Sequence, residues 1–439
     1  MRKLKNVLFL LCLLIFNGIL IQSIQAADLK ISGEYRLNGY AYYELERWTG
    51  PLNISSDYFL QQAVLNTDFH EGMTSGIVQF YLNNLTNGTQ NTGGNIWGTN
   101  GPYSSKLQTG PLIHQAYLNI HFPVGELYAG RRVIKLGHGI ILNDTSDNLS
   151  FHLPISVWEV DVAYLKLSDS DSSRFGTSED YDRSGLLARL NLKLGETDSL
   201  EFFYVKEDQR ATGLMAADTD VLALGVSGSA RMIGIDWSGE FDLLSGRDGD
   251  LRVDLPRAGN NLLISGSTQF SFGRLGLEVL RIKGKALGET SYNSLAGDFA
   301  GGNGILLNDQ TRFGGGIDLN HGMADMADPS GYLRLLSHNF QLVKGSVVFN
   351  PLKKLILSVE LFPFVLVIDR GVSGLTNDKI GMEANFTGAY PLGDSLKISG
   401  GIAYFKAGDV LQEIASKNPI FSSVASNVIK SHLSLLFTF

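Results

Sequence analysis

The chain has 439 residues and a formal net charge of −8, and only 18% of its residues are charged, against roughly 25% in an ordinary soluble domain. Its 50 glycines, 24 phenylalanines and 16 tyrosines, with only 11 prolines, favour many strands and turns and exclude a proline-rich fibrous protein. The acidic balance also excludes nucleic acid as a partner.

The N-terminus has the pattern of an export signal. Basic residues lie within the first five positions, an apolar run follows from Val7 to Ile21, and Ala26 and Ala27 supply small residues for cleavage. We therefore expect residues 1–26 to be a signal peptide. The single cysteine, Cys12, lies within this segment, so the mature chain has no thiol for disulfides, catalysis or metal binding.

Beyond the signal, polar and apolar side chains alternate over long stretches. From Leu29 to Glu44 the apolar residues fall on one face, while Glu34 and Arg36 fall on the other. A period of two over this length predicts a strand longer than those of typical globular sheets. The same alternation recurs in residues 186–194, 233–243, 262–272 and 380–390. Beyond the signal, the sequence has no run of 18 apolar residues, so it predicts no membrane-spanning helix.

The connections between these strands fall into two classes. Short turns are expected at residues 123–126, 195–198, 273–274, 351–354 and 391–394, and long polar loops at residues 84–110, 168–182, 286–337 and 407–426. This sorting is typical of a transmembrane antiparallel β-barrel with short periplasmic turns and long extracellular loops. We predict an all-β fold with residues 27–439 in one barrel of 18 strands, with 16 as the alternative. The loop 286–337 is long enough that we expect it to fold into the pore and narrow it.

The C-terminal residues carry the most specific signal. Leu433, Leu435, Phe437 and Phe439 occupy alternate positions and end in an aromatic residue with a free carboxylate. This run resembles the C-terminal strand signal of bacterial outer-membrane barrels, which implies the barrel-assembly machinery as a partner. Outer-membrane lipid and lipopolysaccharide are the other expected partners, in the outer membrane of a Gram-negative-type bacterium.

A strand, a short turn and a returning Gly-Arg segment run from Ala116 through Arg131 and Arg132 to Gly137. This stretch is similar to the large outer-membrane porins, and most similar to the eighteen-stranded alginate-export-type channels. The resemblance implies passive passage of polar or anionic solutes, oligosaccharides among them. The alginate-type lumen is lined mainly by Arg and Lys, whereas the predicted inner faces here carry both signs.

These mixed charges supply the candidate pore-lining residues: Arg36, Glu34, Arg131, Arg132, Arg189, Lys193, Asp236, Glu240 and Glu383. Arg131 and Arg132 are the strongest candidates for contact with an anionic solute, because one of two adjacent strand residues must face inward. The alternative is that they pair with a neighbouring carboxylate for structural reasons. Interspersed charges predict weak ion discrimination, with a modest cation bias from the acidic outer loops.

Motifs for catalysis, metals or cofactors are weak. The acidic loop 169–182 has Arg174 where a calcium-binding EF-hand requires glycine. His114 and His121 are seven positions apart on a strand and so fall on opposite faces. The close Ser-His pairs, Ser150 with His152 and His432 with its neighbouring serines, match no nucleophile motif. We expect no enzyme, no metal and no cofactor.

Two functional classes remain at this point. The first is a porin-like channel for passive diffusion of small polar or anionic solutes. The second is a non-transporting surface protein, an adhesin or receptor with an occluded lumen. The sequence leaves open whether the barrel is a monomer or a homotrimer.

Overall fold

The computed structural model describes residues 28–43, 57–87, 111–168, 183–209, 219–247, 259–283, 339–368, 375–417 and 427–439. The predicted signal peptide and the loop 286–337 lie outside the described residues. The expectation that this loop narrows the pore therefore stays a prediction.

The described residues form strands of 11 to 16 residues. In chain order they are β1 (Asp28–Tyr43), β2 (Asp57–Glu71), β3 (Thr74–Asn87), β4 (Pro111–Phe122), β5 (Gly125–Lys135), β6 (Asn143–Ile155), β7 (Trp158–Ser168), β8 (Arg183–Lys193), β9 (Ser199–Gln209), β10 (Thr219–Met232), β11 (Ile235–Arg247), β12 (Gly259–Phe270), β13 (Gly273–Lys283), β14 (Asn339–Leu352), β15 (Leu355–Val367), β16 (Lys379–Pro391), β17 (Leu396–Ala407) and β18 (Asn427–Thr438).

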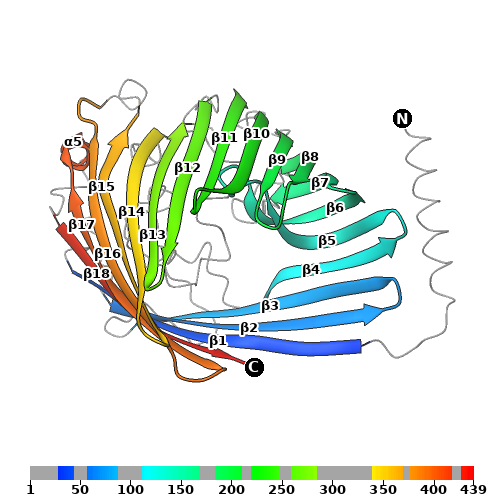
Figure 1. Ribbon diagram of the computed structural model, residues 1–439, viewed down its shortest axis with the longest axis horizontal. Coiled ribbons are helices and arrows are strands. Elements are labelled where there is room, and N and C mark those ends of the chain that lie inside the picture. Colours follow the sequence, from blue (N-terminus) through cyan, green and yellow to red (C-terminus); the bar gives the residue numbers. More distant parts are fainter. Residues whose placement is uncertain are drawn as a thin grey trace, which may run out of the picture.

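Each strand pairs antiparallel with the next, and β1 pairs with both β2 and β18, which closes the sheet into a barrel of 18 strands (Figure 1). Closure leaves no unpaired sheet edge. The predicted fold class and the strand number of 18 are confirmed.

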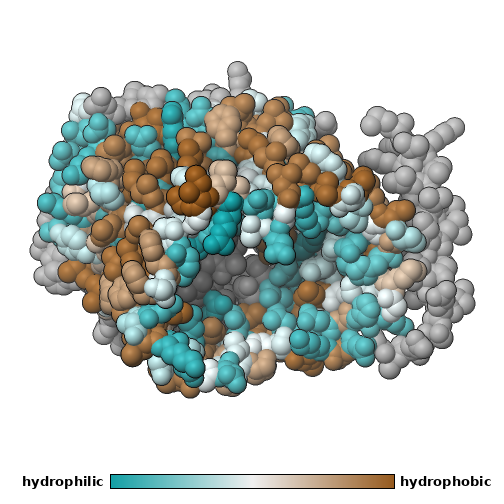
Figure 2. Space-filling view, viewed as in Figure 1, coloured by the Kyte–Doolittle hydropathy of each residue, from teal (hydrophilic) through white to brown (hydrophobic). Residues whose placement is uncertain are grey.

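The two faces of the barrel wall differ as the alternation predicts. On β1, Leu29 and Ile31 are 62% and 60% exposed on the outer face, whereas Asn38 on the inner face is 1% exposed. Figure 2 shows hydrophilic side chains gathered around the central opening and hydrophobic ones over much of the surrounding wall. An apolar outer surface over a closed barrel suits lipid, while the polar inner face suits water.

At one end of the barrel, short turns connect neighbouring strands, and we call this end the short-turn end. Several of these turns have only two residues, and in one of them, Ile233-Gly234, both residues have positive φ, at 54° and 74°. This geometry matches the two-residue hairpin turns whose twist fits the flanking strands, and it favours glycine at the second position.

The last strand presents its predicted signal residues to the outside. Leu433, Leu435, Phe437 and Phe439 are all exposed on the outer face of β18, and the rings of Phe437 and Phe439 stack at 6.1 Å. The backbone N–H of Phe439 donates to the carbonyl of Gly33, and the N–H of Gly33 donates to the carbonyl of Phe439, both at 3.0 Å. The chain terminus is therefore the strand partner that closes the ring.

A helix, α5 (Asp409–Lys417), lies in the segment where the sequence analysis expects only loop. Val410 and Leu411 are buried, and the Glu413 carboxylate accepts the backbone N–H groups of Thr376 and Asn377 at 2.9 and 3.0 Å. The helix therefore ties the β17–β18 connection to the residues that lead into β16. Within the described ranges, no helix has the length and apolar composition needed to cross a membrane.

Candidate pore constriction

The connection between β5 and β6, residues 136–142, folds against the inside of the barrel. Leu136, Ile140, Ile141 and Leu142 are all buried, at 0–3% exposure. A backbone hydrogen bond from Leu136 N–H to the Leu142 carbonyl, at 2.9 Å, closes the base of the segment. We call residues 136–142 the inner loop.

Backbone hydrogen bonds latch the inner loop to the wall of β9–β11. The N–H of Gly137 donates to the Glu201 carboxylate at 2.8 Å, and the N–H of His138 donates to the Glu240 carboxylate in a short contact. His138 Nε2 also lies 3.4 Å from the carbonyl oxygen of Gly228. Gly137 has φ +53°, and a Cβ there would lie 2.3 Å from a Glu240 oxygen, so this close approach requires glycine.

An apolar cluster also holds the inner loop in place, beside the hydrogen bonds to Glu201 and Glu240, which we call the latch. The loop residues and Ile134 pack against inward-facing side chains of β7–β11, namely Ala163, Leu165, Leu187, Phe203, Val205, Val221, Ala223 and Leu244. Burial of each large aliphatic side chain contributes about 1.5–3 kcal/mol. The inner loop is therefore a fixed part of the lumen wall on this side of the barrel.

Arg132 stands at the foot of the inner loop and faces the lumen. Its Nη2 donates to Ser150 Oγ at 2.7 Å, its Nε donates to Asn148 Oδ1 at 3.2 Å, and its guanidinium lies 4.2 Å from the centre of the Tyr128 ring. These partners are all uncharged. In the part of the chain that the structure describes, no carboxylate is hydrogen-bonded to Arg132.

Neighbouring charges on the same wall are paired. Arg189 Nη2 lies 2.7 Å from Asp161 Oδ2, and His152 Nδ1 lies 2.9 Å from the other oxygen of that carboxylate. Lys193 forms a short ion pair with Glu159. These pairs form a ladder down the inner faces of β6–β8, from the inner loop toward the short-turn end.

A small cavity of about 60 Å³ lies where this ladder meets the inner loop. Its lining includes Arg132, Ser150, Asp161, Arg189 and Leu136. With Arg132, Arg189 and Lys135 against the single carboxylate of Asp161, the lining of this cavity has an excess of positive charge. Its guanidinium groups are of the kind that bind carboxylates and phosphates.

The structure places eight of the nine candidate pore-lining residues on inner faces. Arg36 pairs with Glu34 at 2.7 Å, and Asp236 lies 3.5 Å from Arg231 near the short-turn end. Glu240 and Glu383 are buried inside the barrel wall, so they are not lumen surface. Arg132, Arg189 and Lys193 come together near the inner loop.

Arg131 differs from the expectation that it lines the pore. Consecutive strand residues point to opposite faces, and Arg132 is on the inner face. Arg131 is therefore outside the barrel, where its Nη1 lies 3.8 Å from Asp147 Oδ1 on the outer face of β6. The interpretation of Arg131 as a residue paired to a neighbouring carboxylate fits this contact.

The inner loop is not predicted from the sequence. The loop 286–337, which is predicted to narrow the pore, lies outside the described residues. The signal for the inner loop was its composition: Leu136, Gly137 and Gly139 precede three consecutive aliphatic residues, Ile140 to Leu142, in a connection too short to form a solvated loop.

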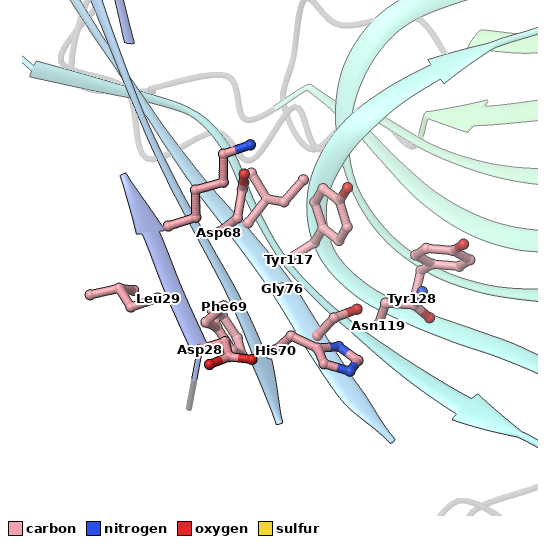
Figure 3. A pocket seen from close by; sticks show the side chains of 12 residues that line it. Asp28, Leu29, Asp68, Phe69, His70, Gly76, Tyr117, Asn119 and Tyr128 are labelled. Carbon is pink, nitrogen blue, oxygen red and sulfur yellow. The ribbon is translucent and has the colours of Figure 1, made fainter. Parts of the chain in front are cut away.

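A second cavity, of about 500 Å³, opens at the short-turn end. Figure 3 shows Tyr117, Asn119 and Tyr128 on one side of it and Asp68 and His70 on the other. These side chains come from β2, β4 and β5; β4 and β5 are adjacent in the sheet, and β3 lies between β2 and β4. Among the described residues, no group of three His, Cys, Asp or Glu side chains has a metal-binding arrangement.

Solved structures with the same architecture cover almost all of the chain. OccK3 (OpdO) of Pseudomonas aeruginosa has a TM-score of 0.57 and 11% identity over 94% of this chain and 96% of its own. OccAB4 of Acinetobacter baumannii has a TM-score of 0.53 and 10% identity, over 95% of this chain and 100% of its own. OpdK of P. aeruginosa, solved with vanillate, has a TM-score of 0.53 and 9% identity, over 93% of this chain and 98% of its own.

The Pseudomonas proteins among these neighbours are outer-membrane porins. No protein-family model and no curated protein matches the sequence. The likeness lies in the fold, and the alginate-export subtype is not tested by it. The chain therefore has the barrel architecture of the Occ and Opd porins.

Proposed function

We propose that this chain is an outer-membrane channel for passive diffusion of small anionic solutes. The observation that carries the proposal is the inner loop, which is fixed inside the barrel beside Arg132, a cation whose hydrogen-bond partners among the described residues are neutral. Barrels of this strand number enclose a lumen wide enough for water, and a loop fixed inside it restricts which solutes pass.

Arg132 gives the proposed channel its charge preference. The acidic outer loops alone would predict a modest cation bias. Within a narrow lumen, however, the nearest charge dominates, because screening reduces more distant contributions. Ion pairs such as Glu34–Arg36, Asp161–Arg189 and Glu278–Lys344 neutralise other parts of the inner face. We therefore propose a modest anion preference that is set at Arg132.

Small aromatic carboxylates are the first solutes to test. A guanidinium beside the ring of Tyr128 offers both a charge for a carboxylate and an aromatic face for a ring. The structural neighbour OpdK was solved with vanillate, a molecule of this kind. The alginate-type proposal rests on the resemblance over residues 116–137, and the paired acidic residues on the inner wall weigh against a continuous basic lining.

Reconstitution tests the channel directly. Purified barrel in a planar bilayer should give discrete current steps, and benzoate should reduce the chloride current more than benzyl alcohol at the same concentration. The alcohol is the matched control, because it keeps the ring and lacks the charge. A folded barrel that carries no current would instead favour the non-transporting surface protein.

Outer-membrane assembly is the second part of the proposal. The exposed apolar face of β18 and its stacked terminal rings support recognition by the barrel-assembly machinery. Deletion of Phe439 should strongly lower the amount of heat-modifiable barrel in outer membranes. Replacement of Thr438, whose side chain belongs to the inner face, with alanine is the control and should assemble normally. Equal assembly of both variants would contradict this role.

A further inference from the structure

A polar cluster at the short-turn end has a geometry that the channel function does not require. It lies on the inner faces of β3, β4 and β5, where the strands leave their turns. His121 is directly opposite Glu126 in the β4–β5 register, and Ser75 is directly opposite Asn119 in the β3–β4 register. Residues far apart in the sequence therefore meet on one patch of wall.

His121 bridges a serine and a carboxylate through its two ring nitrogens. Its Nε2 lies 3.3 Å from Ser75 Oγ, and its Nδ1 lies 3.1 Å from Glu126 Oε1. A nucleophile, a base within hydrogen-bond reach and a group that orients the base define the arrangement of serine hydrolases.

The hydrogen bonds of Glu126 favour the tautomer of His121 that a general base requires. Glu126 accepts a short hydrogen bond from the Tyr128 hydroxyl and one from Asn119 Nδ2 at 3.4 Å. With the carboxylate as an acceptor, the ring proton belongs on Nδ1 of His121. The lone pair of Nε2 then points toward Ser75, as a general base requires.

The serine opens onto space that can hold a substrate. Ser75 lines the 500 Å³ cavity together with Tyr117, Asn119, Tyr128 and Lys30. His121 is not among the residues that line this cavity, and its side chain is 39% exposed. A bound acyl group would meet the Ser75 hydroxyl, with His121 Nε2 3.3 Å from Ser75 Oγ to take its proton.

We propose that Ser75, His121 and Glu126 form a hydrolase site for small carboxylic esters. Ser75 Oγ attacks the ester carbonyl carbon while His121 Nε2 takes the hydroxyl proton. The C–O bond to the alcohol then breaks, and His121 returns the proton to the leaving alcohol. Water, deprotonated by His121, attacks the acyl-serine, and the carboxylic acid leaves as Ser75 regains its proton. Glu126 is a positioning residue for His121.

Asn119 is the side chain placed to stabilise the oxyanion. Its Nδ2 lies 3.4 Å from His121 Nε2, the same atom that lies 3.3 Å from Ser75 Oγ. The backbone N–H groups of these strands are largely engaged in the sheet, so an amide side chain replaces the usual backbone donors.

One of the Ser-His pairs considered from the sequence, Ser150 with His152, lacks this arrangement. Ser150 accepts from Arg132 and donates to Asn148, while His152 pairs with Asp161. The two proposals can be tested separately, because in the described structure Ser75, His121 and Glu126 make no contact with the inner loop or Arg132, although Tyr128 contacts both Glu126 and Arg132. A failed hydrolase test would leave the channel proposal unchanged.

Covalent labelling tests the nucleophile. Folded protein in detergent is incubated with a fluorophosphonate probe, and the modified residue is identified by mass spectrometry. We expect an adduct on Ser75 that is lost in Ser75→Ala and in His121→Ala. Ser238→Ala is the control, because Ser238 is a lumen-facing serine whose partner is Ser265, and it should label as the unmodified protein does. Absence of an adduct on Ser75 in the folded protein would overturn the proposal.

Turnover of p-nitrophenyl acetate tests the triad as a unit. Because general acid–base catalysis contributes about 10²–10⁴-fold, Ser75→Ala and His121→Ala should each lower kcat/KM by roughly 100-fold or more. Glu126→Gln should lower kcat more than it raises KM, since it acts on the orientation of His121. Heat-modifiable gel mobility confirms the folded barrel for each variant. Turnover that persists in Ser75→Ala and disappears in His121→Ala would show that imidazole alone reacts with the ester and would overturn the proposal.

Discussion

Two neighbouring stretches of the inner wall carry charged side chains and use them differently. On β5–β8, Arg132, Arg189 and Lys193 remain at the lumen surface, and Lys193 is 58% exposed. On β9–β11, Glu240 and Asp242 are 2% and 0% exposed beneath the inner loop. The same alternation places both sets inward, and a seven-residue connection decides which set a solute can reach.

The comparison separates the direction of a side chain from its role. An inward charged side chain that is exposed to solvent acts on ions and solutes. An inward carboxylate that is buried beneath the inner loop can instead accept backbone N–H groups and hold the loop in place. Glu240 has the second role through the N–H of His138. Unpaired backbone donors in a buried setting are costly, which is why such a carboxylate stabilises the loop.

The largest expected effect comes from placing a charge in the apolar cluster. Ile141 belongs to the inner loop and is fully buried in the apolar cluster that joins the loop to the wall. Ile141→Asp would bury an unpaired carboxylate, so the loop should leave the wall. Because the lumen of an 18-stranded barrel is then open, single-channel conductance should rise about twofold or more. Ile141→Val keeps the apolar contact and should conduct as the unmodified protein does. Equal conductance of both folded variants would contradict the constriction.

A smaller effect is expected when the latch is removed and the cluster is kept. Glu240→Ala leaves the His138 N–H without its acceptor, at a cost of about 1–3 kcal/mol. The loop should then detach part of the time, which would appear as added open-channel noise and a modest rise in mean current. Glu240→Gln retains a side-chain oxygen and should be quieter than Glu240→Ala. Identical noise in the two variants would show that the cluster alone fixes the loop.

The smallest expected effect on ion preference comes from a paired charge on the inner wall of β6–β8. Asp161→Asn removes the carboxylate that neutralises Arg189, so the anion preference measured by reversal potential should increase slightly. Asp147→Asn is the matched control, because Asp147 pairs with Arg131 on the outer face. A similar shift in both variants would show that the effect does not arise in the lumen.

Much of the fold could be predicted from the sequence. Alternation in β1 and the signal residues of β18 determine the facing of most strands, because a strand has a strict period of two. Helix α5 could not be predicted in the same way, since its short amphipathic segment lies within a polar connection and is stabilised by tertiary contacts such as Glu413 with Thr376.

The candidate site was predictable only in part. Adjacent arginines at 131 and 132 required that one face inward, but the stretch from Leu127 to Lys135 lacks clear alternation, so the sequence could not choose between them. The contacts of Glu240 with His138 and of Ser75 with His121 join residues more than forty positions apart. Such pairs depend on strand register and loop packing, which local patterns do not encode.

The adjacent arginines also provide the most direct test of the central claim. Reversal potentials are measured across a potassium chloride gradient at about 0.1 M, where the Debye length is about 10 Å and local charge still acts. The account predicts that the unmodified channel prefers anions modestly, that Arg132→Ala shifts the reversal potential toward cations, and that Arg131→Ala leaves it unchanged. Equal shifts in the two variants, or a cation-preferring channel insensitive to Arg132→Ala, would contradict the assignment of selectivity to the foot of the inner loop.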